Sequence, residues 1–204
     1  MNLPNALTVS RIFLVPLLVV VLLTTFEGRM IFGVPKEVVG AAIFGVASFT
    51  DWLDGYLARR RQEITVLGQL IDPIADKLLT AAAFISLVQL GLAPAWMVAI
   101  IIGRELAVTG LRSVAYSKGI VIAASRLGKV KMVAEVVTIL ALILGRGQLG
   151  DFLVIGEVGL WVVMATAVWS GADYYIRFAA QLTARQEIPG HREDDDLHRQ
   201  SRAS

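Results

Sequence analysis

Four aspartates in one short segment are the clearest candidates for chemistry in this chain. Asp51 and Asp54 are three positions apart, and Asp72 and Asp76 are four apart. Residues at these spacings share one face of an α-helix, so each pair would present two carboxylates together. If the two helices form an antiparallel hairpin joined by residues 58–68, all four carboxylates can converge in one pocket. Their charges would then repel unless cations neutralise them, and hard divalent ions such as Mg²⁺ or Mn²⁺ prefer oxygen ligands.

The residues between the aspartates favour a ligand site over simple ion pairing. Gly55 has no side chain and Ala58 only a methyl group, so a ligand can approach the helix backbone closely there. Arg59 adds a planar fork of donors that suits phosphate oxygens. The combination predicts two metal ions and a substrate that carries a pyrophosphate. The alternative is that each aspartate pairs with an arginine, and the available arginines are Arg59, Arg60, Arg61, Arg104 and Arg112.

The elements that must position these residues are helices in a membrane. Hydrophobic residues make up 56% of the 204 residues and the mean hydropathy is +0.67, whereas soluble domains are roughly 45–50% apolar. The absence of cysteine excludes disulfides and thiolate metal sites. A spanning helix needs about 20 mostly apolar residues. The sequence therefore predicts an all-α integral membrane protein with six transmembrane helices, at about 6–26, 38–57, 70–90, 95–116, 130–144 and 152–179.

The distribution of lysine and arginine predicts the orientation. Cytoplasmic loops of membrane proteins are rich in these residues, whereas translocated loops are poor in them. With both termini inside, all but three of the 19 cations lie on the inner side, the exceptions being Arg29, Lys36 and Arg146. The first apolar run has no convincing cleavage site after it, so we expect a retained helix. We therefore expect a multi-pass protein of a bacterial-type inner membrane, with the four aspartates facing the cytoplasm.

The end of the chain differs from the rest in composition. Residues 181–204 are polar and show no apolar periodicity, so they are predicted to form a disordered cytoplasmic tail after a membrane domain at 1–180. A metal site built from Asp194, Asp195 and Asp196 with the histidines beside them is less favoured than a solvated tail.

The aspartate segment also matches a known pattern. The stretch "DWLDGYLARRRQEITVLGQLIDPIAD" fits D-x2-D-G-x2-A-R-x8-G-x3-D-x3-D without departure from Asp51 to Asp76. In this respect the chain resembles the CDP-alcohol phosphotransferase family. The resemblance implies a six-helix, usually homodimeric membrane enzyme with a cytoplasm-facing site, which replaces the CMP of a CDP-linked lipid with an alcohol.

The resemblance also implies a role for each matched position. Asp51, Asp54 and Asp72 resemble metal ligands, and Asp76 resembles the ligand that also acts as general base. The positions that resemble the CDP-lipid site are Asp51, Gly55, Ala58, Arg59 and Gly68. Thr65 is a further candidate for that site through its hydroxyl group, with a helix N-cap as the alternative.

Two further stretches bear on the acceptor alcohol. "NLPNALTVSRI" at the start of the chain and "GRELAVTGLRSVAYSKGIVIAASRLGKVKM" from Gly103 to Met132 resemble the bacterial phosphatidylglycerophosphate synthases. That resemblance implies CDP-diacylglycerol as donor and sn-glycerol 3-phosphate as acceptor. A doubly charged acceptor requires a basic pocket, and the candidates for it are Arg112, Ser125, Arg126, Lys129 and Lys131. The alternative for these cations is anchoring at the inner membrane surface. Arg104 and Glu105 are better explained as a structural pair.

Other functions remain as alternatives. A phosphatidylinositol-phosphate synthase or a cardiolipin synthase of the same fold would keep the aspartate chemistry with another acceptor. A divalent-cation transporter would also use membrane carboxylates, but it would distribute them along a pore and not gather them at one membrane face. The expected partners are the two substrates, membrane lipids and a second copy of the chain, with no nucleic acid.

Overall fold

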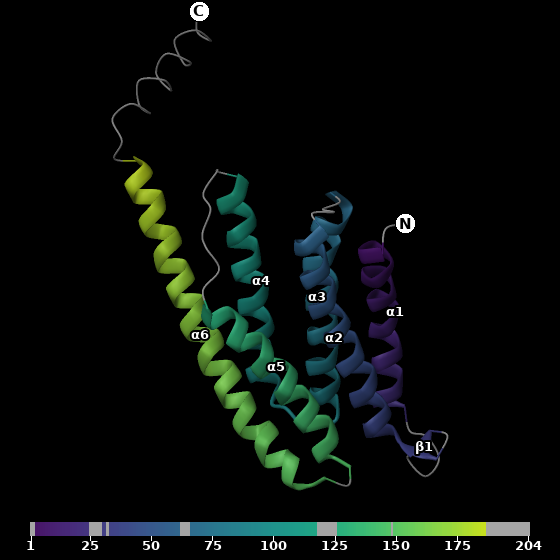
Figure 1. Cartoon of the computed structure of the whole chain (residues 1–204). Helices are drawn as coiled ribbons and strands as arrows, with labels where there is room; N and C mark the ends of the chain where they lie inside the picture. The colour runs from purple at the N-terminus through teal and green to yellow at the C-terminus, as the bar shows by residue number, and fades with distance from the viewer. Residues whose placement is uncertain are drawn as a thin grey trace, which may run out of the picture.

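The protein is built almost entirely from helices. The computed structural model describes residues 3–24, 30–31, 33–61, 66–117, 126–147 and 149–186, and the side chains of 12–24, 30–31, 33–50, 77–115, 130–147 and 149–180. The helices are α1 (Leu3–Leu23), α2 (Lys36–Arg61), α3 (Val66–Gln89), α4 (Ala95–Ser117), α5 (Arg126–Gly145) and α6 (Asp151–Gln186). In Figure 1, α1, α3 and α4 are nearly upright, whereas α5 and α6 slant across the view. The prediction of an all-helical protein is thus confirmed, and each predicted apolar range overlaps one of these helices.

The ends of the elements differ in places from the predicted ranges. The helix α5 begins at Arg126, before its predicted range, because the polar residues of its first turn carry no apolar signal. The helix α6 continues past residue 180 to Gln186, and the chain after it lies outside the described residues. Two short strands, β1 (Met30–Ile31) and β2 (Val34–Pro35), were not predicted. They form an antiparallel ladder between α1 and α2.

The helices form two groups that share one core. The helix α1 packs on α2 and α3, and α6 packs on α4 and α5, while α2 also packs on α5 and joins the groups. In Figure 1 the long helix α6 flanks α4 and α5 on one side of the molecule, with α1 on the other. The core that they enclose contains fully buried side chains from all six helices, among them Leu18, Phe44, Phe84, Met97, Leu142 and Val163.

Hydrogen bonds at the ends of the helices fix the turn between α3 and α4. The N–H group of Leu92 donates to the carbonyl of Leu87 at 2.9 Å, and that of Gly91 donates to Val88 at 2.9 Å. Gly91 has a φ of 72°, which places it in the left-handed region that a glycine after a helix adopts readily. This Schellman motif ends α3 and reverses the chain into α4.

Two of the three cations predicted to lie outside bind helix ends. The buried ammonium of Lys36 donates to the carbonyl oxygens of Leu22 and Thr24, at 3.1 and 2.9 Å, at the end of α1. The guanidinium of Arg146 donates to the carbonyl oxygen of Leu90, at 3.4 Å, after the end of α3. Carbonyl groups at a helix C-terminus lack intrahelical donors and attract positive charge. Lys36 and Arg146 therefore stabilise the helix ends at the opposite end of the bundle from the aspartates.

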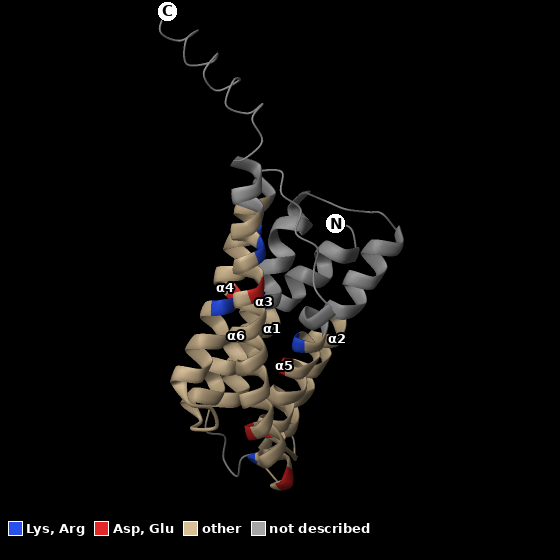
Figure 2. Ribbon diagram, turned by 90° about the vertical axis from the view of Figure 1, so that its left-hand side faces the viewer, with Lys and Arg blue, Asp and Glu red and all other residues tan. Residues whose placement is uncertain are grey.

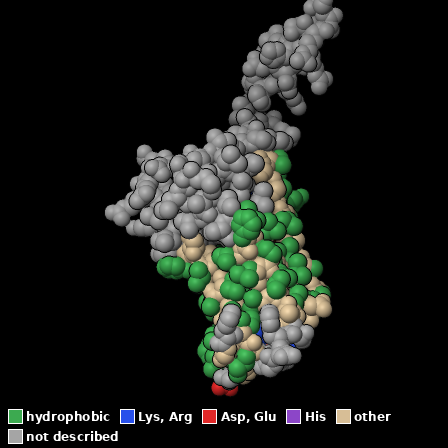
Figure 3. All heavy atoms as spheres, turned by 90° about the vertical axis from the view of Figure 1, so that its right-hand side faces the viewer, with side chains coloured by type: hydrophobic (Ala, Val, Ile, Leu, Met, Phe, Trp, Pro, Cys, Tyr) green, Lys and Arg blue, Asp and Glu red, His purple; other side chains and the backbone are tan. Residues whose placement is uncertain are grey.

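Many large hydrophobic side chains are exposed among the described residues. Figure 3 shows hydrophobic side chains spread over the described part of one face. Among the described residues, one helix is long and apolar enough to cross a membrane, at Asp151–Ala180 of α6. Only 22% of its most apolar window is buried, whereas the core helix of a soluble protein would be mostly buried. Shorter apolar helical segments lie at Ile12–Leu23 and Lys77–Gln89. The prediction of six spans stays a prediction.

Candidate active site

The four aspartates lie on two consecutive helices, near the end of the first and the start of the second. Asp51 and Asp54 belong to the second half of α2, and Asp72 and Asp76 belong to the first half of α3. Their helical placement keeps the predicted i, i+3 and i, i+4 spacing, which puts each pair on one helix face. The helices α2 and α3 contact each other. The side chains of all four aspartates lie outside the described residues, so their convergence in one pocket stays a prediction.

The positions assigned to the CDP-lipid fall at the same end of the bundle. Gly55, Ala58 and Arg59 lie in the last turns of α2, and Gly68 lies in the first turn of α3. The side chains of these residues lie outside the described part, as does Thr65 altogether. The backbone therefore agrees with a site built from the end of α2 and the start of α3.

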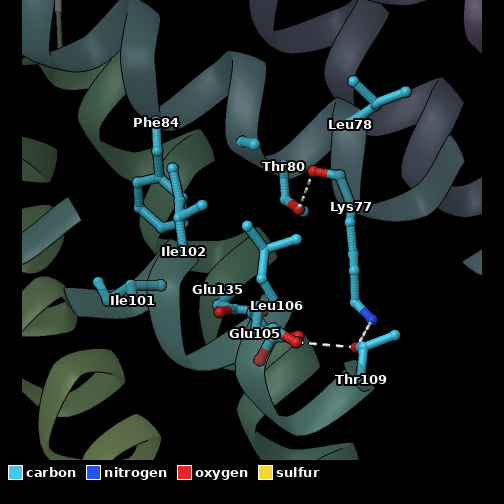
Figure 4. A pocket seen from close by; sticks show the side chains of 11 residues that line it. Lys77, Leu78, Thr80, Phe84, Ile101, Ile102, Glu105, Leu106, Thr109 and Glu135 are labelled. Carbon is cyan, nitrogen blue, oxygen red and sulfur yellow. Dashed lines mark hydrogen bonds between the residues drawn. The ribbon is translucent and has the colours of Figure 1, made fainter. Parts of the chain in front are cut away.

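A hydrogen bond next to the aspartates fixes how α3 lies against α4. Lys77, which follows Asp76 in the chain, donates from its ammonium group to the hydroxyl of Thr109 on α4. That hydroxyl in turn donates to the carbonyl oxygen of Glu105 at 2.8 Å. Figure 4 shows Lys77 extended along the helix toward Thr109. The middle of α4 is thereby held at the level of the second aspartate pair.

A pocket of about 390 Å³ lies between α3, α4 and α5 beside this hydrogen bond. Most of its wall is apolar, and Glu105 and Glu135 contribute carboxylates to it, as Figure 4 shows. The residues that line it are Lys77, Leu78, Thr80, Ala81, Phe84, Ile101, Ile102, Glu105, Leu106, Thr109 and Glu135. Its dimensions are within the usual range of small-molecule sites.

Lys131, which the sequence analysis named as a candidate for binding the acceptor phosphate, is buried in a network of charges. Its side chain is only 4% exposed. Its ammonium group donates to Glu135 Oε1 at 2.6 Å and to Glu105 Oε1. Two carboxylates therefore already surround this lysine. A contact between Lys131 and an acceptor phosphate stays a prediction, and it would require the ammonium group to share or leave these partners.

Arg104 extends the same network to α6. Its Nη1 pairs with Glu105, its Nη2 donates to the hydroxyl of Ser170, and its Nε donates to the carbonyl oxygen of Ala167 at 3.1 Å. The predicted structural pair of Arg104 and Glu105 is thus confirmed. In Figure 2 the described charges lie around the middle height of the ribbon and near its lower tip. In this network one arginine and one lysine balance two glutamates, so it is neutral overall. The network joins α4, α5 and α6.

The remaining acceptor candidates are Arg112, Ser125, Arg126 and Lys129. Arg112 is exposed, and its guanidinium carbon lies 5.9 Å from the centre of the Tyr174 ring on α6. Arg126 and Lys129 lie in the first turn of α5, but their side chains are outside the described residues. Ser125 precedes that helix and is also outside them. The first turn of α5 therefore carries both Arg126 and Lys129, three positions apart.

Three residues of this region were not identified as site residues from the sequence, namely Glu135, Lys77 and Tyr174. Glu135 is an acidic residue within a predicted span, and such residues are costly without partners, so its position alone was a signal. Lys77 and Tyr174 carried no comparable signal, because their contacts lie on other helices. For metal binding, no group of three or more His, Asp or Glu occurs among the described side chains, which exclude the four aspartates.

Comparison with known proteins identifies the class of protein. A sequence model described as CDP-alcohol phosphatidyltransferase matches residues 1–169. The match includes the aspartate helices and most of α6. The chain belongs to the CDP-alcohol phosphatidyltransferase family.

The curated relatives narrow the comparison further. The chain is 45% identical over 181 residues to a CDP-diacylglycerol–glycerol-3-phosphate 3-phosphatidyltransferase of Bacillus subtilis (strain 168), covering 85% of this chain and 93% of the relative. It is 34% identical over 176 residues to the enzyme of that name from Rickettsia felis, covering 85% and 93%. It is 39% identical over 176 residues to a probable phosphatidylglycerophosphate synthase of Mycobacterium tuberculosis (strain CDC 1551 / Oshkosh), covering 86% and 81%.

Proposed function

We propose that this protein transfers the phosphatidyl group of CDP-diacylglycerol to sn-glycerol 3-phosphate, giving phosphatidylglycerophosphate and CMP. The observation that carries the proposal is the likeness to the CDP-diacylglycerol–glycerol-3-phosphate 3-phosphatidyltransferase of Bacillus subtilis over 93% of that enzyme's length. The unbroken aspartate pattern on α2 and α3 supports it, because that pattern supplies the residues such a transfer requires.

The donor set fits divalent metal ions. Asp51, Asp54, Asp72 and Asp76 offer only carboxylate oxygens, which are ligands that Mg²⁺ and Mn²⁺ prefer, and four of them suffice for two ions. Bound at this position, the ions would neutralise charge on the pyrophosphate as it reacts.

The chain's own residues then perform the transfer. Asp76 accepts the proton of the acceptor hydroxyl, and the hydroxyl oxygen forms a bond to the lipid-side phosphorus. The bond from that phosphorus to the CMP oxygen breaks, and CMP leaves with the electron pair. Arg59 holds phosphate oxygens through its fork of donors, while Gly55 and Ala58 leave the α2 backbone open to the nucleotide. Positioning supplies much of the rate in such a transfer.

The acceptor phosphate is received at the ends of α4 and α5. This basic site is formed by Arg112, Ser125, Arg126 and Lys129. Lys131 joins it if its ammonium group donates to the phosphate as well as to Glu105 and Glu135. The doubly charged acceptor is attracted there by the surrounding cations. The same cations keep this end of a six-span bundle at the cytoplasmic surface of the membrane. The enzyme works as a homodimer in this proposal.

The test is CMP release by the purified protein in detergent with CDP-diacylglycerol and Mg²⁺. Glycerol 3-phosphate, inositol 1-phosphate, serine and phosphatidylglycerol are supplied separately as acceptors. We expect release with glycerol 3-phosphate alone. Release only with inositol 1-phosphate or only with phosphatidylglycerol would keep the aspartate chemistry and overturn the acceptor. A preparation that releases no CMP with any acceptor, while a purified relative does so under the same conditions, would overturn the proposal.

A further inference from the structure

The helix α4 carries two arginines that contact α6, and their surroundings differ sharply. Arg104 is paired with Glu105 and hydrogen bonded to Ser170 and the Ala167 carbonyl, so its charge and donors are already used. Arg112 lies two turns further along and is exposed. Among the described side chains it has no carboxylate partner. An exposed guanidinium at the end of the bundle proposed for the phosphorylated substrates offers donors that suit phosphate oxygens.

The Arg112 guanidinium is held on one side by an aromatic ring. Its carbon lies 5.9 Å from the ring centre of Tyr174, a distance at which a cation is attracted to the face of an aromatic ring. This interaction neutralises no charge and occupies none of the guanidinium N–H donors in the way that a carboxylate would. The ring therefore fixes Arg112 while leaving its donors for a ligand.

The hydroxyl group of the same tyrosine is the second feature that bears on this contact. The Tyr174 side chain is 9% exposed, and its hydroxyl oxygen is buried with no hydrogen-bond partner. Buried tyrosine hydroxyl groups usually find a partner, because leaving one unpaired is costly. The neighbouring residue Tyr175 provides a contrast, since it is 62% exposed. A ligand bound beside Arg112 would supply the missing partner of Tyr174.

We propose that Tyr174 belongs to the acceptor site, where its ring positions Arg112 and its hydroxyl group donates a hydrogen bond to the phosphorylated acceptor. The proposal deepens the function proposed above and rests on it for the identity of the acceptor. Tyr174 comes from α6, whereas the other acceptor candidates come from α4, α5 and the residue before α5. The site is thereby closed by a third helix. The anchoring of Arg104 to Ser170 keeps α4 and α6 in register, which holds Tyr174 at the level of Arg112.

The test compares the Tyr174→Phe variant with a matched Tyr175→Phe control. Tyr174→Phe keeps the ring and removes only the hydroxyl group. We expect its KM for glycerol 3-phosphate to rise about tenfold, the effect of losing one hydrogen bond to a charged group. The KM for CDP-diacylglycerol and the kcat should change less than about twofold, and Tyr175→Phe should match the wild type. An unchanged acceptor KM in Tyr174→Phe, or an equal rise in Tyr175→Phe, would overturn the proposal.

The role of the ring is tested with Tyr174→Leu and Arg112→Ala. If the ring acts through Arg112, Tyr174→Leu raises the acceptor KM more than Tyr174→Phe does. Adding Tyr174→Leu to Arg112→Ala should then raise it no more than Tyr174→Phe does alone, because only the hydroxyl contact remains to be lost. Fully additive effects would show that the ring does not position Arg112.

Thermal unfolding separates this inference from the identity of the acceptor. Because the hydroxyl group has no protein partner, Tyr174→Phe should not lower the Tm of the ligand-free protein. Inorganic phosphate should raise the Tm of the wild type more than that of Tyr174→Phe. A lower ligand-free Tm in Tyr174→Phe, or an equal response to phosphate, would show a structural hydroxyl and overturn the inference. A wild type that ignores glycerol 3-phosphate in the CMP assay, yet shows the phosphate difference, would overturn the acceptor assignment alone.

Discussion

At the scale of single residues, Lys131 and Lys129 show how neighbours decide the role of a charge. The two lysines are two positions apart at the start of α5. Lys131 is buried between Glu105, on another helix, and Glu135, one turn along its own helix. Removing one member of such a network leaves an unpaired buried charge, so it contributes to the arrangement of α4 and α5. Lys129 therefore remains the better candidate for the acceptor phosphate.

The metal proposal predicts the effect of changing one aspartate. Asp72→Asn removes a charged ligand and keeps the size of the side chain. We expect kcat to fall by about 100-fold or more, beyond the loss seen when a residue that only supports a metal ligand is changed. The apparent Mg²⁺ concentration required should rise, measured as CMP release across a Mg²⁺ titration. Wild-type rates in Asp72→Asn would contradict the two-metal site.

The acceptor proposal predicts a different kinetic change for Lys129. Lys129→Ala removes a positive charge from the acceptor site without touching the aspartates. We expect the KM for glycerol 3-phosphate to rise about tenfold, with little change in the KM for CDP-diacylglycerol. The control is Arg177→Ala, which removes an exposed cation that pairs with Asp173 on α6. If the acceptor KM rises equally in both variants, Lys129 does not bind the acceptor phosphate directly. It then acts only by general attraction of the substrate or by anchoring the protein at the membrane.

At the scale of elements, the contact between α5 and α6 depends on a glycine. A Cβ atom added at Gly156 of α6 would lie 2.6 Å from the Cγ atom of Leu142 and 3.0 Å from its backbone nitrogen. Leu142 is fully buried, so it has little room to move. Small residues at helix contacts allow such close approach in membrane proteins.

This contact predicts the outcome of Gly156→Ala. The added methyl group should lower the free energy of unfolding by about 1–3 kcal/mol through overpacking. Thermal unfolding in detergent measures the change. The control is Gly103→Ala on α4, where the added atom meets nothing within 4 Å. Because alanine favours helices by about 1 kcal/mol over glycine, Gly103→Ala should be neutral or slightly stabilising. A Gly156→Ala variant as stable as the Gly103→Ala variant would contradict the close packing.

At the scale of the whole molecule, the two ends of the bundle carry different charges. The end that carries the aspartates also carries most of the lysines and arginines, whereas Lys36 and Arg146 at the other end cap the carbonyl ends of α1 and α3. Exceptions to the charge bias thus have a local structural role. They leave the predicted orientation, with the active site at the cytoplasmic surface, unchanged.

The absence of cysteine makes the orientation directly testable. Met30→Cys places a thiol in β1, where the native side chain is 51% exposed. Ser201→Cys places one near the end of the chain. In intact cells, a membrane-impermeant maleimide should label Met30→Cys, and it should label Ser201→Cys only after the membrane is opened. The reverse pattern would place the active site on the outer face.

The helical class, the approximate helix ranges and the family could all be predicted from the amino-acid sequence. Apolar runs of membrane length and the fixed spacing of the aspartate motif are local properties, and they can be read along the chain without knowledge of what packs where. The positions of Asp51, Asp54, Asp72 and Asp76 on helix faces belong to this part.

The contacts of side chains between helices could not be predicted in this way and came from the packed structure. The pairing of Lys131 with Glu105, the anchoring of Arg104 by Ser170 and the placement of Arg112 over Tyr174 join residues 26 or more positions apart. No periodicity encodes these contacts, because they depend on the register and separation of packed helices. The same lysine, read along the chain, looks like a phosphate ligand. Its buried position beside two carboxylates gives it a structural role in the absence of substrate.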